Sequence, residues 1–430
     1  MRNLARLNCL AGVAVSRAFS LAGSTDGVPA AMQINAGTST PGRRGPNNTG
    51  EKLVDYFKSV APKLLRPAEG VLRHPSISSS PPGKACSNQF RDSDTYWTAR
   101  GLFRHAELTP DGDLHRNLSE HVQSSLLNLF DHQSENERIP IMIDVNDAGF
   151  IGCLRTKAPN PNNQVKPSMG QLALLIADDV GDLKSLAPRF DNLLRFYDSW
   201  ILGNPTDLGL LVWGDDVAIG DDNDSTTFGR PFFSSATLML NCLYYEDLRA
   251  AAELSQRLNR TLDAQILSHR RDELNDSIQT CFRDPRDRFF YTVDVESVDC
   301  RAELIPNPNR GMAMSWNCLP LRIQMFTGFL PMWCGLASAE HANELLHIHY
   351  LNSDKFRAEA GVRSLSSGES MYSSVFSSSP SNWLGPMWIV VNYVVWKGFE
   401  TYGFEAEAQD LADKTVRVLP TELSTSGSTN

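Results

Sequence analysis

The sequence has little of several features that mark particular classes of protein. Its 430 residues contain only eight cysteines, with no Cys-x-x-Cys pair and no cysteine–histidine cluster at the spacing of a zinc site, so we expect no bound metal. No apolar run reaches the about 20 residues that span a bilayer. Basic residues form no long run and the net charge is −10. We therefore expect neither nucleic acid nor a membrane as a partner, whereas a small neutral ligand such as a sugar is compatible.

The cysteines are scattered, mostly among apolar residues, where cysteine acts as a small hydrophobic side chain. This pattern favours free thiols and a cytoplasmic location. One or two disulfide bonds, and a secreted or organellar location, stay open as alternatives.

The N-terminal region differs in composition from the rest of the chain. Residues 1–25 contain Arg2, Arg6 and Arg17 but no acid, which fits either a targeting segment or a start codon placed too early. Residues 23–50 are rich in Gly, Ser, Thr, Pro and Asn and hold few large apolar residues, a composition that does not order itself. We predict a disordered or targeting tail over residues 1–50 and one folded domain over residues 51–430.

Helical periodicity dominates this domain. Apolar residues recur at helical spacing around residues 122–130, 193–201, 244–258 and 408–419. Alternating strand patterns are scarce, and residues 289–296 (FFYTVDVE) are the best candidate. Long loops rich in Trp, Asp, Asn, Gly and Pro separate the helical segments. The pattern predicts an all-α fold, a toroid of paired helices whose loops gather at one end to build a site.

One loop has an unusual composition. Ten of the nineteen residues from 364 to 382 are serine, which predicts a solvated surface loop. The loop leads into residues 382–388 (NWLGPMW), and the two tryptophans there indicate a functional segment.

Residues 213–224 (WGDDVAIGDDND) hold the densest group of acids and amides, since six of these twelve residues are Asp or Asn. Such residues also cap helices, and oxygen-rich loops bind calcium, but the spacing lacks the regular ligand pattern of a calcium loop. Trp213 and Phe228 lie close by in the sequence. A carboxyl group held against apolar walls has a raised pKa and can act as a general acid.

Tryptophan supplies a second indication. Aromatic faces stack on the apolar faces of sugar rings, while carboxylates and amides bind sugar hydroxyls. A single tryptophan is better explained by core packing. Five of them beside Gly, Pro, Asn or Asp favour a carbohydrate cleft, namely Trp97, Trp213, Trp316, Trp383 and Trp388.

These residues carry a family resemblance that extends from about Leu72 to the C-terminus. The chain resembles the inverting glycosidases of glycoside hydrolase family 63, and is similar to mannosylglycerate hydrolase-like and trehalase-like proteins. The matching segments are 72–75 (LRHP), 92–101 (DSDTYWTARG), 166–167 (KP), 216–243, 329–333 (FLPMW), 361–365 (GVRSL), 382–388 and 392–393 (NY). The resemblance implies an (α/α)6 barrel that hydrolyses a small α-glucoside or α-mannoside, such as a sugar–glycerate, without a cofactor.

The resemblance also implies roles for individual residues. The acid of the family's Gly-x-Asp-Asn motif corresponds to Asp222, which would protonate the leaving oxygen. A second carboxyl would activate water from the opposite face, roughly 6.5–9.5 Å away. Asp94 corresponds to an acid that holds the sugar in the innermost subsite, and Trp383, Trp388 and Tyr393 to the wall of that subsite. Trp97 and Trp213 complete the predicted substrate-binding set.

The sequence departs from the family pattern at three places. Ser93 stands where relatives carry a tryptophan, and Asp221 stands at a commonly apolar position, where its charge would raise the pKa of Asp222 or disturb the site. The family's general base is a glutamate that we expect just after Asn430, followed by the last helices of the barrel. Glu369 and Glu422 are the other acids considered for this role, and neither matches the family position.

Two other interpretations stay open. The chain could be an inactive sugar-binding relative with the same fold. It could also be a helical-barrel enzyme of another class, such as a sugar epimerase that uses histidine. His341, His347 and His349 cluster on an apparently helical segment, where we expect them to face solvent. The sequence leaves the oligomeric state open.

Overall fold

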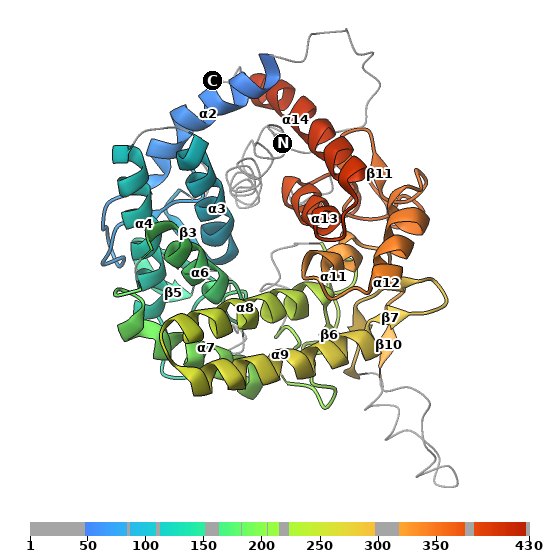
Figure 1. The fold of residues 1–430 in the computed structure, drawn as a ribbon, viewed down its shortest axis with the longest axis horizontal. Coiled ribbons are helices and arrows are strands. Elements are labelled where there is room, and N and C mark those ends of the chain that lie inside the picture. The colour runs from blue at the N-terminus through green and yellow to red at the C-terminus, as the bar shows by residue number, and fades with distance from the viewer. Residues whose placement is uncertain are drawn as a thin grey trace.

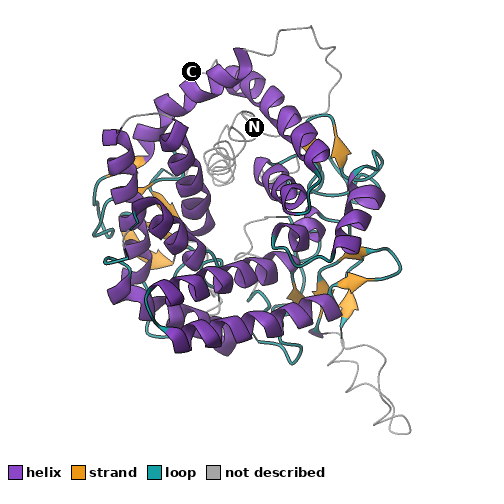
Figure 2. Cartoon of the chain, viewed as in Figure 1, coloured by secondary structure: helices purple, strands orange, loops and turns teal. Residues whose placement is uncertain are grey.

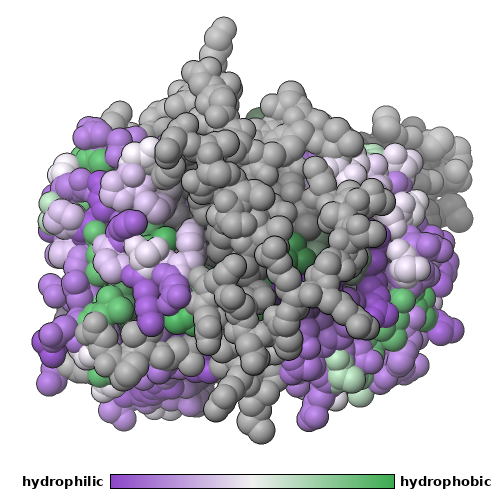
Figure 3. Space-filling view, turned by 90° about the horizontal axis from the view of Figure 1, so that it is seen from above, coloured by the Kyte–Doolittle hydropathy of each residue, from purple (hydrophilic) through white to green (hydrophobic). Residues whose placement is uncertain are grey.

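The computed structural model describes residues 48–83, 87–108, 112–150, 163–181, 183–203, 205–214, 223–296, 318–374 and 382–426. These residues form a ring of helices in two layers (Figure 1). The strands are short and lie at the periphery of the ring (Figure 2). Seen from above, polar side chains cover most of the visible described part of that face (Figure 3). The all-α toroid predicted from the sequence is confirmed.

Outer and inner helices alternate along the chain (Figure 1). The outer layer contains α2 (Asn48–Leu64), α4 (Gly112–Asp131), α7 (Phe190–Gly203), α9 (Thr261–Cys281), α12 (Ala339–Glu344) with its π-helical continuation η5 (Leu345–Tyr350), and α14 (Glu405–Ser426). The inner layer contains α3 (Asp92–Leu108), α6 (Met169–Val180), α8 (Leu238–Arg257), α11 (Leu330–Trp333) and α13 (Ile389–Thr401). Each inner helix packs on outer neighbours or on the next inner helix, and α14 packs on α2 to close the ring.

In the described part of the chain, five small antiparallel sheets brace the loops. They pair β1 (Leu65–Arg66) with β2 (Ser76–Ile77), β7 (Arg283–Asp284) with β8 (Phe289–Phe290), and β11 (Arg357–Ala358) with β12 (Gly361–Val362). One three-stranded sheet has the order β3 (Gln89–Arg91), β4 (Met142–Asp144), β5 (Asp147–Phe150). The other has the order β10 (Leu319–Pro320), β9 (Val293–Asp294), β6 (Ser235–Ala236). The single strand expected over residues 289–296 is therefore two short strands in different sheets.

Apolar periodicity locates the helices correctly. Each of the four predicted stripes falls on a helix, namely α4, α7, α8 and α14. In α7, Leu193, Phe196, Tyr197 and Trp200 are buried, whereas Ile201, the last member of the predicted stripe, is 37% exposed. The inner helix α6 is apolar on nearly every side because other helices surround it.

A close approach of three helices fixes the start of α6. The Oδ1 atom of Asp247, on α8, accepts the backbone N–H of Gln171 at 2.8 Å, and its Oδ2 accepts the hydroxyl of Tyr197, on α7, at 3.0 Å. A Cβ atom added to Gly170 would lie 2.3 Å from the Tyr197 hydroxyl oxygen. Only glycine therefore fits at this position without displacing its neighbours.

The serine-rich loop corrects one expectation. Ser364 and Ser366 are 0% and 1% exposed, so these serines do not belong to a solvated surface loop. The Ser364 hydroxyl accepts the backbone N–H of Gly385 at 3.0 Å. The hydroxyls replace water as hydrogen-bond partners where the loop packs beneath residues 382–388.

None of the helices in the described part of the chain combines the length and the hydropathy of a membrane span. The described core is one continuous cluster of buried apolar side chains that extends from Leu53 to Val416. Helix α2 begins at Asn48, so three residues of the stretch expected to form the tail belong to the first described helix.

We predict that Asp247 makes stability depend on pH. Burial raises the pKa of its carboxyl from 3.8 to about 6, against the opposing effect of its hydrogen bonds. Between these values the folded chain binds more protons than the unfolded chain, so stability falls as the pH rises from about 4 to about 6. Asp247→Asn removes this titration and should flatten the profile by up to about 3 kcal/mol.

The measurement is urea unfolding followed by tryptophan fluorescence at pH values from 4 to 7. Asp113→Asn is the matched control, because the Asp113 side chain is 91% exposed. Parallel profiles for the wild type and Asp247→Asn contradict the prediction.

Candidate active site

The segments that lead into the inner helices carry most of the predicted site residues. Asp94 lies in the first turn of α3, Trp213 precedes α8, and Trp388 is the N-cap residue of α13. Contacts between distant parts of the chain show that these segments meet. Thus the Ser225 hydroxyl lies 3.6 Å from the sulfur of Met325, just before η4 (Phe326–Phe329).

Asp222, the predicted general acid, lies outside the described residues, as does Asp221. The described residues on both sides of 215–222 are nevertheless firmly held. On the N-terminal side, the indole N–H of Trp213 donates to the Thr237 hydroxyl at 3.0 Å. Thr237 is the N-cap residue of α8 and its hydroxyl also accepts the backbone N–H of Leu240. This side of the loop is therefore tied to the start of α8.

Asn223 holds the C-terminal side. Its Oδ1 atom accepts the backbone N–H of Trp383 at 2.6 Å, and its Nδ2 donates to Oδ1 of Asn382 at 3.1 Å. The Asn382 carbonyl in turn accepts the indole N–H of Trp388 at 3.0 Å. The residue next to Asp222 is thus joined by two hydrogen bonds to a segment about 160 residues later in the sequence.

Three aromatic rings form a stack beside this network. The rings of Trp383 and Trp388 lie parallel, with centroids 4.2 Å apart and 4° between their planes. Phe326 covers Trp383 at 5.7 Å and 28°. Both faces of Trp383 are therefore covered by other rings. Trp383 is 0% exposed and Trp388 is 5% exposed.

Trp97 and Tyr393 form a second aromatic group. Their rings meet edge to face with centroids 5.7 Å apart, and Trp333 lies 6.4 Å from Trp97. The Tyr393 hydroxyl accepts a hydrogen bond from the Arg100 guanidinium at 2.6 Å. Asp94 is 2% exposed and lies one turn before Trp97 on α3. The structure brings α3 and α13 together here, as the prediction of a shared subsite requires.

Trp213 belongs to a different environment. It is 3% exposed and packs edge to face on Trp200, with ring centroids 5.7 Å apart. Its described contacts are with α7 and with the start of α8, which supports a packing and anchoring role. Trp316, the other tryptophan of the predicted cleft, lies outside the described residues.

Asp224, two residues after Asp222, is structural. Its Oδ1 atom accepts both the backbone N–H and the hydroxyl of Thr226, each at 2.7 Å. Burial raises the pKa of this carboxyl. The short local turn that results fixes the direction in which the chain leaves Asn223.

No sequence motif pointed to Phe326, which packs on Trp383. Phe228 and Phe232 are 63% and 62% exposed, which is unusual for phenylalanine, and both lie shortly after Asn223. Phe228 was expected to form an apolar wall. Its exposure instead makes it a surface aromatic side chain near the acidic loop.

The histidine cluster does not form a site among the described residues. His349 was expected to face solvent, but it is 1% exposed. Its Nε2 atom donates to the Asp287 carbonyl at 3.0 Å, and burial together with the nearby Lys355 lowers its pKa to about 4. It is held neutral as part of the core. No group of three or more His, Cys, Asp or Glu side chains suited to a metal ion occurs in the described part of the chain.

Comparisons with known proteins agree with the geometry. A family model described as the mannosylglycerate hydrolase MGH1-like glycoside hydrolase domain matches residues 118–424. A search of curated proteins finds no match.

Solved structures give the same fold. The family 63 mannosylglycerate hydrolase from Thermus thermophilus, in complex with glucose, superposes with a TM-score of 0.55 at 17% identity, over 71% of this chain and 80% of that one. Neutral trehalase Nth1 from Saccharomyces cerevisiae gives 0.52 at 16% identity, over 84% and 72%. At these identities the likeness concerns the fold, which is that of the (α/α)6 glycosidases.

We predict that Asn223 stabilises the site by joining its two loops. Asn223→Ala removes the acceptor of the Trp383 N–H and the donor to Asn382. The free energy of unfolding should fall by about 1–2 kcal/mol, and the fluorescence of the stacked tryptophans should change. Asn343→Ala is the control, because Asn343 is exposed and donates only within its own helix, to the carbonyl of Ala339. An equal, small effect of both substitutions speaks against this role of Asn223.

Proposed function

Because the chain belongs to the mannosylglycerate hydrolase MGH1-like glycoside hydrolases, we propose that it hydrolyses a small α-glucoside or α-mannoside, such as a sugar–glycerate, with inversion at the anomeric carbon. The family makes the chain a glycoside hydrolase. The type of sugar, the leaving group and the stereochemistry are the proposal, together with residues 51–430 as the catalytic domain.

The proposed substrate is supported by what similar structures hold. The Thermus thermophilus mannosylglycerate hydrolase has been solved with glucose, and also with Tris and D-glycerate. A hexose and a glycerate are the two parts into which a sugar–glycerate is split. We carry this substrate class to the present chain because the fold and the family are shared.

The anchoring of Asn223 is the observation that carries the proposal. It joins the residue beside Asp222 directly to the segment with Trp383 and Trp388. A general acid must lie within hydrogen-bonding reach of the leaving oxygen while the sugar occupies the neighbouring subsite. The hydrogen bonds of Asn223 would couple these two requirements, because they tie the residue next to the acid to the segment that forms the subsite wall.

We assign the sugar-binding roles to the residues around this junction. Asp94 would accept hydrogen bonds from sugar hydroxyls, while Trp97, Trp388 and Tyr393 would provide aromatic surface. Trp383 would act mainly by supporting Trp388, since its own faces are covered. Trp213 would act by holding the acidic loop to α8.

The general acid would protonate the leaving oxygen, and a second carboxylate would take a proton from the attacking water. Glu369 is poorly suited to the second role. Its Oε1 atom accepts the backbone N–H of Gln324 at 2.9 Å, which supports a structural function for this carboxylate.

We predict that Asp222→Asn lowers kcat by about 10²–10⁴-fold, the range for loss of a general acid–base group. Binding should persist, because the amide keeps the size and the hydrogen-bonding capacity of the side chain. The substrates to test are mannosylglycerate, glucosylglycerate and trehalose, with turnover followed by NMR. The first product should be the β-anomer of the free sugar if the mechanism is inverting.

Asp113→Asn, at an exposed position on α4, is the control and should retain wild-type turnover. Turnover by Asp222→Asn at the wild-type rate contradicts the assignment of the acid. An initial α-anomer contradicts inversion. Sugar binding by the wild type without hydrolysis of any substrate favours the inactive sugar-binding relative instead.

A further inference from the structure

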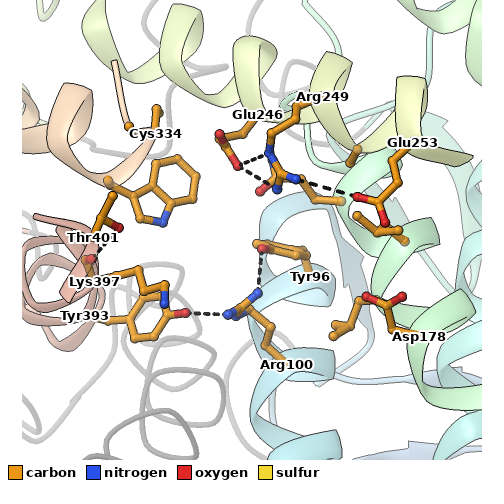
Figure 4. A pocket seen from close by; sticks show the side chains of 16 residues that line it. Tyr96, Arg100, Asp178, Glu246, Arg249, Glu253, Cys334, Tyr393, Lys397 and Thr401 are labelled. Carbon is orange, nitrogen blue, oxygen red and sulfur yellow. Dashed lines mark hydrogen bonds and ion pairs between the residues drawn. The ribbon is translucent and has the colours of Figure 1, made fainter. Parts of the chain in front are cut away.

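The inner helices enclose a cavity that shares Tyr393 with the proposed sugar-binding site and extends from it toward other residues. Its volume is about 450 Å³, within the range of small-molecule pockets. Figure 4 shows side chains from several inner helices that surround it. The residues that matter here are Tyr96 and Arg100 of α3, Asp178 of α6, Glu246, Arg249 and Glu253 of α8, Trp333 of α11, and Tyr393, Lys397 and Thr401 of α13.

The cavity opens toward the C-terminal ends of the inner helices. Asp178 is in the last turn of α6, and Thr401 is the last residue of α13. The side chains near these ends are exposed, with 55% for Asp178 and 43% for Lys397. Tyr96 and Tyr393, nearer the N-terminal ends, are 4% and 1% exposed. The candidate active site lies at those N-terminal ends, so the cavity opens on the opposite side of the ring.

Most charges of the cavity are balanced by the protein itself. Arg249 pairs with Glu246 at 3.0 Å and lies 3.8 Å from Glu253, as Figure 4 shows. Two other charged lining residues pair with residues that do not line the cavity. Asp178 pairs with Arg257 at 2.7 Å, and Lys397 pairs with the exposed Glu400 at 3.2 Å.

Arg100 is different. Its guanidinium donates to the hydroxyls of Tyr96 at 3.2 Å and Tyr393 at 2.6 Å, and no carboxylate of the described residues lies within ion-pair distance of it. Burial raises the pKa of Tyr96 to about 12, with Arg100 as the main opposing influence, so this hydroxyl stays neutral. A neutral hydroxyl satisfies a guanidinium N–H but does not balance its charge.

We propose that this cavity binds an anion of monosaccharide size, whose carboxylate or phosphate group pairs with Arg100. A partly buried cation without a counter-ion is unfavourable, and an incoming anion relieves that penalty with charge-assisted hydrogen bonds. Trp333, Tyr96 and Tyr393 offer aromatic surface to the rest of the ligand. Thr401, Glu253 and Asp178 offer hydroxyl and carboxylate groups to its hydroxyls.

The composition of the cavity distinguishes this ligand from a fully neutral sugar. The charged residues that line the cavity are Arg100, Arg249 and Lys397 against Asp178, Glu246 and Glu253, so the lining as a whole carries no net charge. Arg100 is the lining cation that has no ion-pair partner among the described residues, so an anion gains most beside it. A neutral sugar gains no such contribution.

The test is isothermal titration calorimetry, which measures the dissociation constants of gluconate, glucose 6-phosphate and glucose. We expect one or both anions to bind, and the tighter of the two identifies carboxylate or phosphate as the preferred group. Arg100→Gln should weaken this binding about tenfold or more, the size expected for the loss of a charge-assisted interaction. Glucose should show no dependence on Arg100.

Two further variants make the result decisive. Lys397→Glu changes an exposed residue at the mouth and should weaken anion binding several-fold even if Arg100→Gln does not fold. Arg116→Gln is the matched control, since the Arg116 side chain is 79% exposed on α4 and should bind like the wild type. Asp94→Asn, a substitution in the proposed sugar-binding site that does not line this cavity, should bind the anions like the wild type, which separates the two sites. Equal affinity for glucose and both anions, or wild-type anion binding by Lys397→Glu, overturns the proposal.

Discussion

The inner layer of this ring is subject to one constraint that shapes the rest of the molecule. A helix surrounded by other helices has almost no access to water, so each polar group on it needs a partner from the protein. Helix α6 meets this condition with an almost entirely apolar sequence and with Asp247, which receives its first backbone N–H groups. Its neighbour α8 can carry Glu246 only because Arg249 lies beside it.

The same constraint separates packing from chemistry. Several polar residues lie at or near the ends of the inner helices, while Arg100 and Glu246, in the middle of α3 and α8, have partners from the protein. At the N-terminal ends this gives Asn223, Asn382 and the stacked Trp383 and Trp388, a polar and aromatic junction typical of sugar recognition. At the C-terminal ends it gives a charged cavity. One ring of helices thus carries a polar and aromatic junction and a charged cavity.

Much of this architecture could be predicted from the sequence. Helical stripes depend on local spacing, so α4, α7, α8 and α14 followed directly from apolar periodicity. The composition of residues 382–388 predicted a functional segment, and the structure joins this segment to Asn223. What could not be predicted depends on contacts between distant residues. The burial of Ser364 and His349, the cover of Phe326 over Trp383, and the hydrogen bond of Arg100 to Tyr393 arise only when separate helices meet.

The contact between α2 and α14 has a consequence for how the chain is made. Each helical hairpin can form from neighbouring residues soon after synthesis, but the ring closes only when its first and last described helices meet. Contacts across such a long stretch of sequence form slowly. A nascent chain therefore forms an open arc of hairpins, in which the apolar face of α2 is exposed until α14 packs on it. During that interval the exposed apolar surface favours aggregation, and the net charge of −10 opposes it by repulsion between copies.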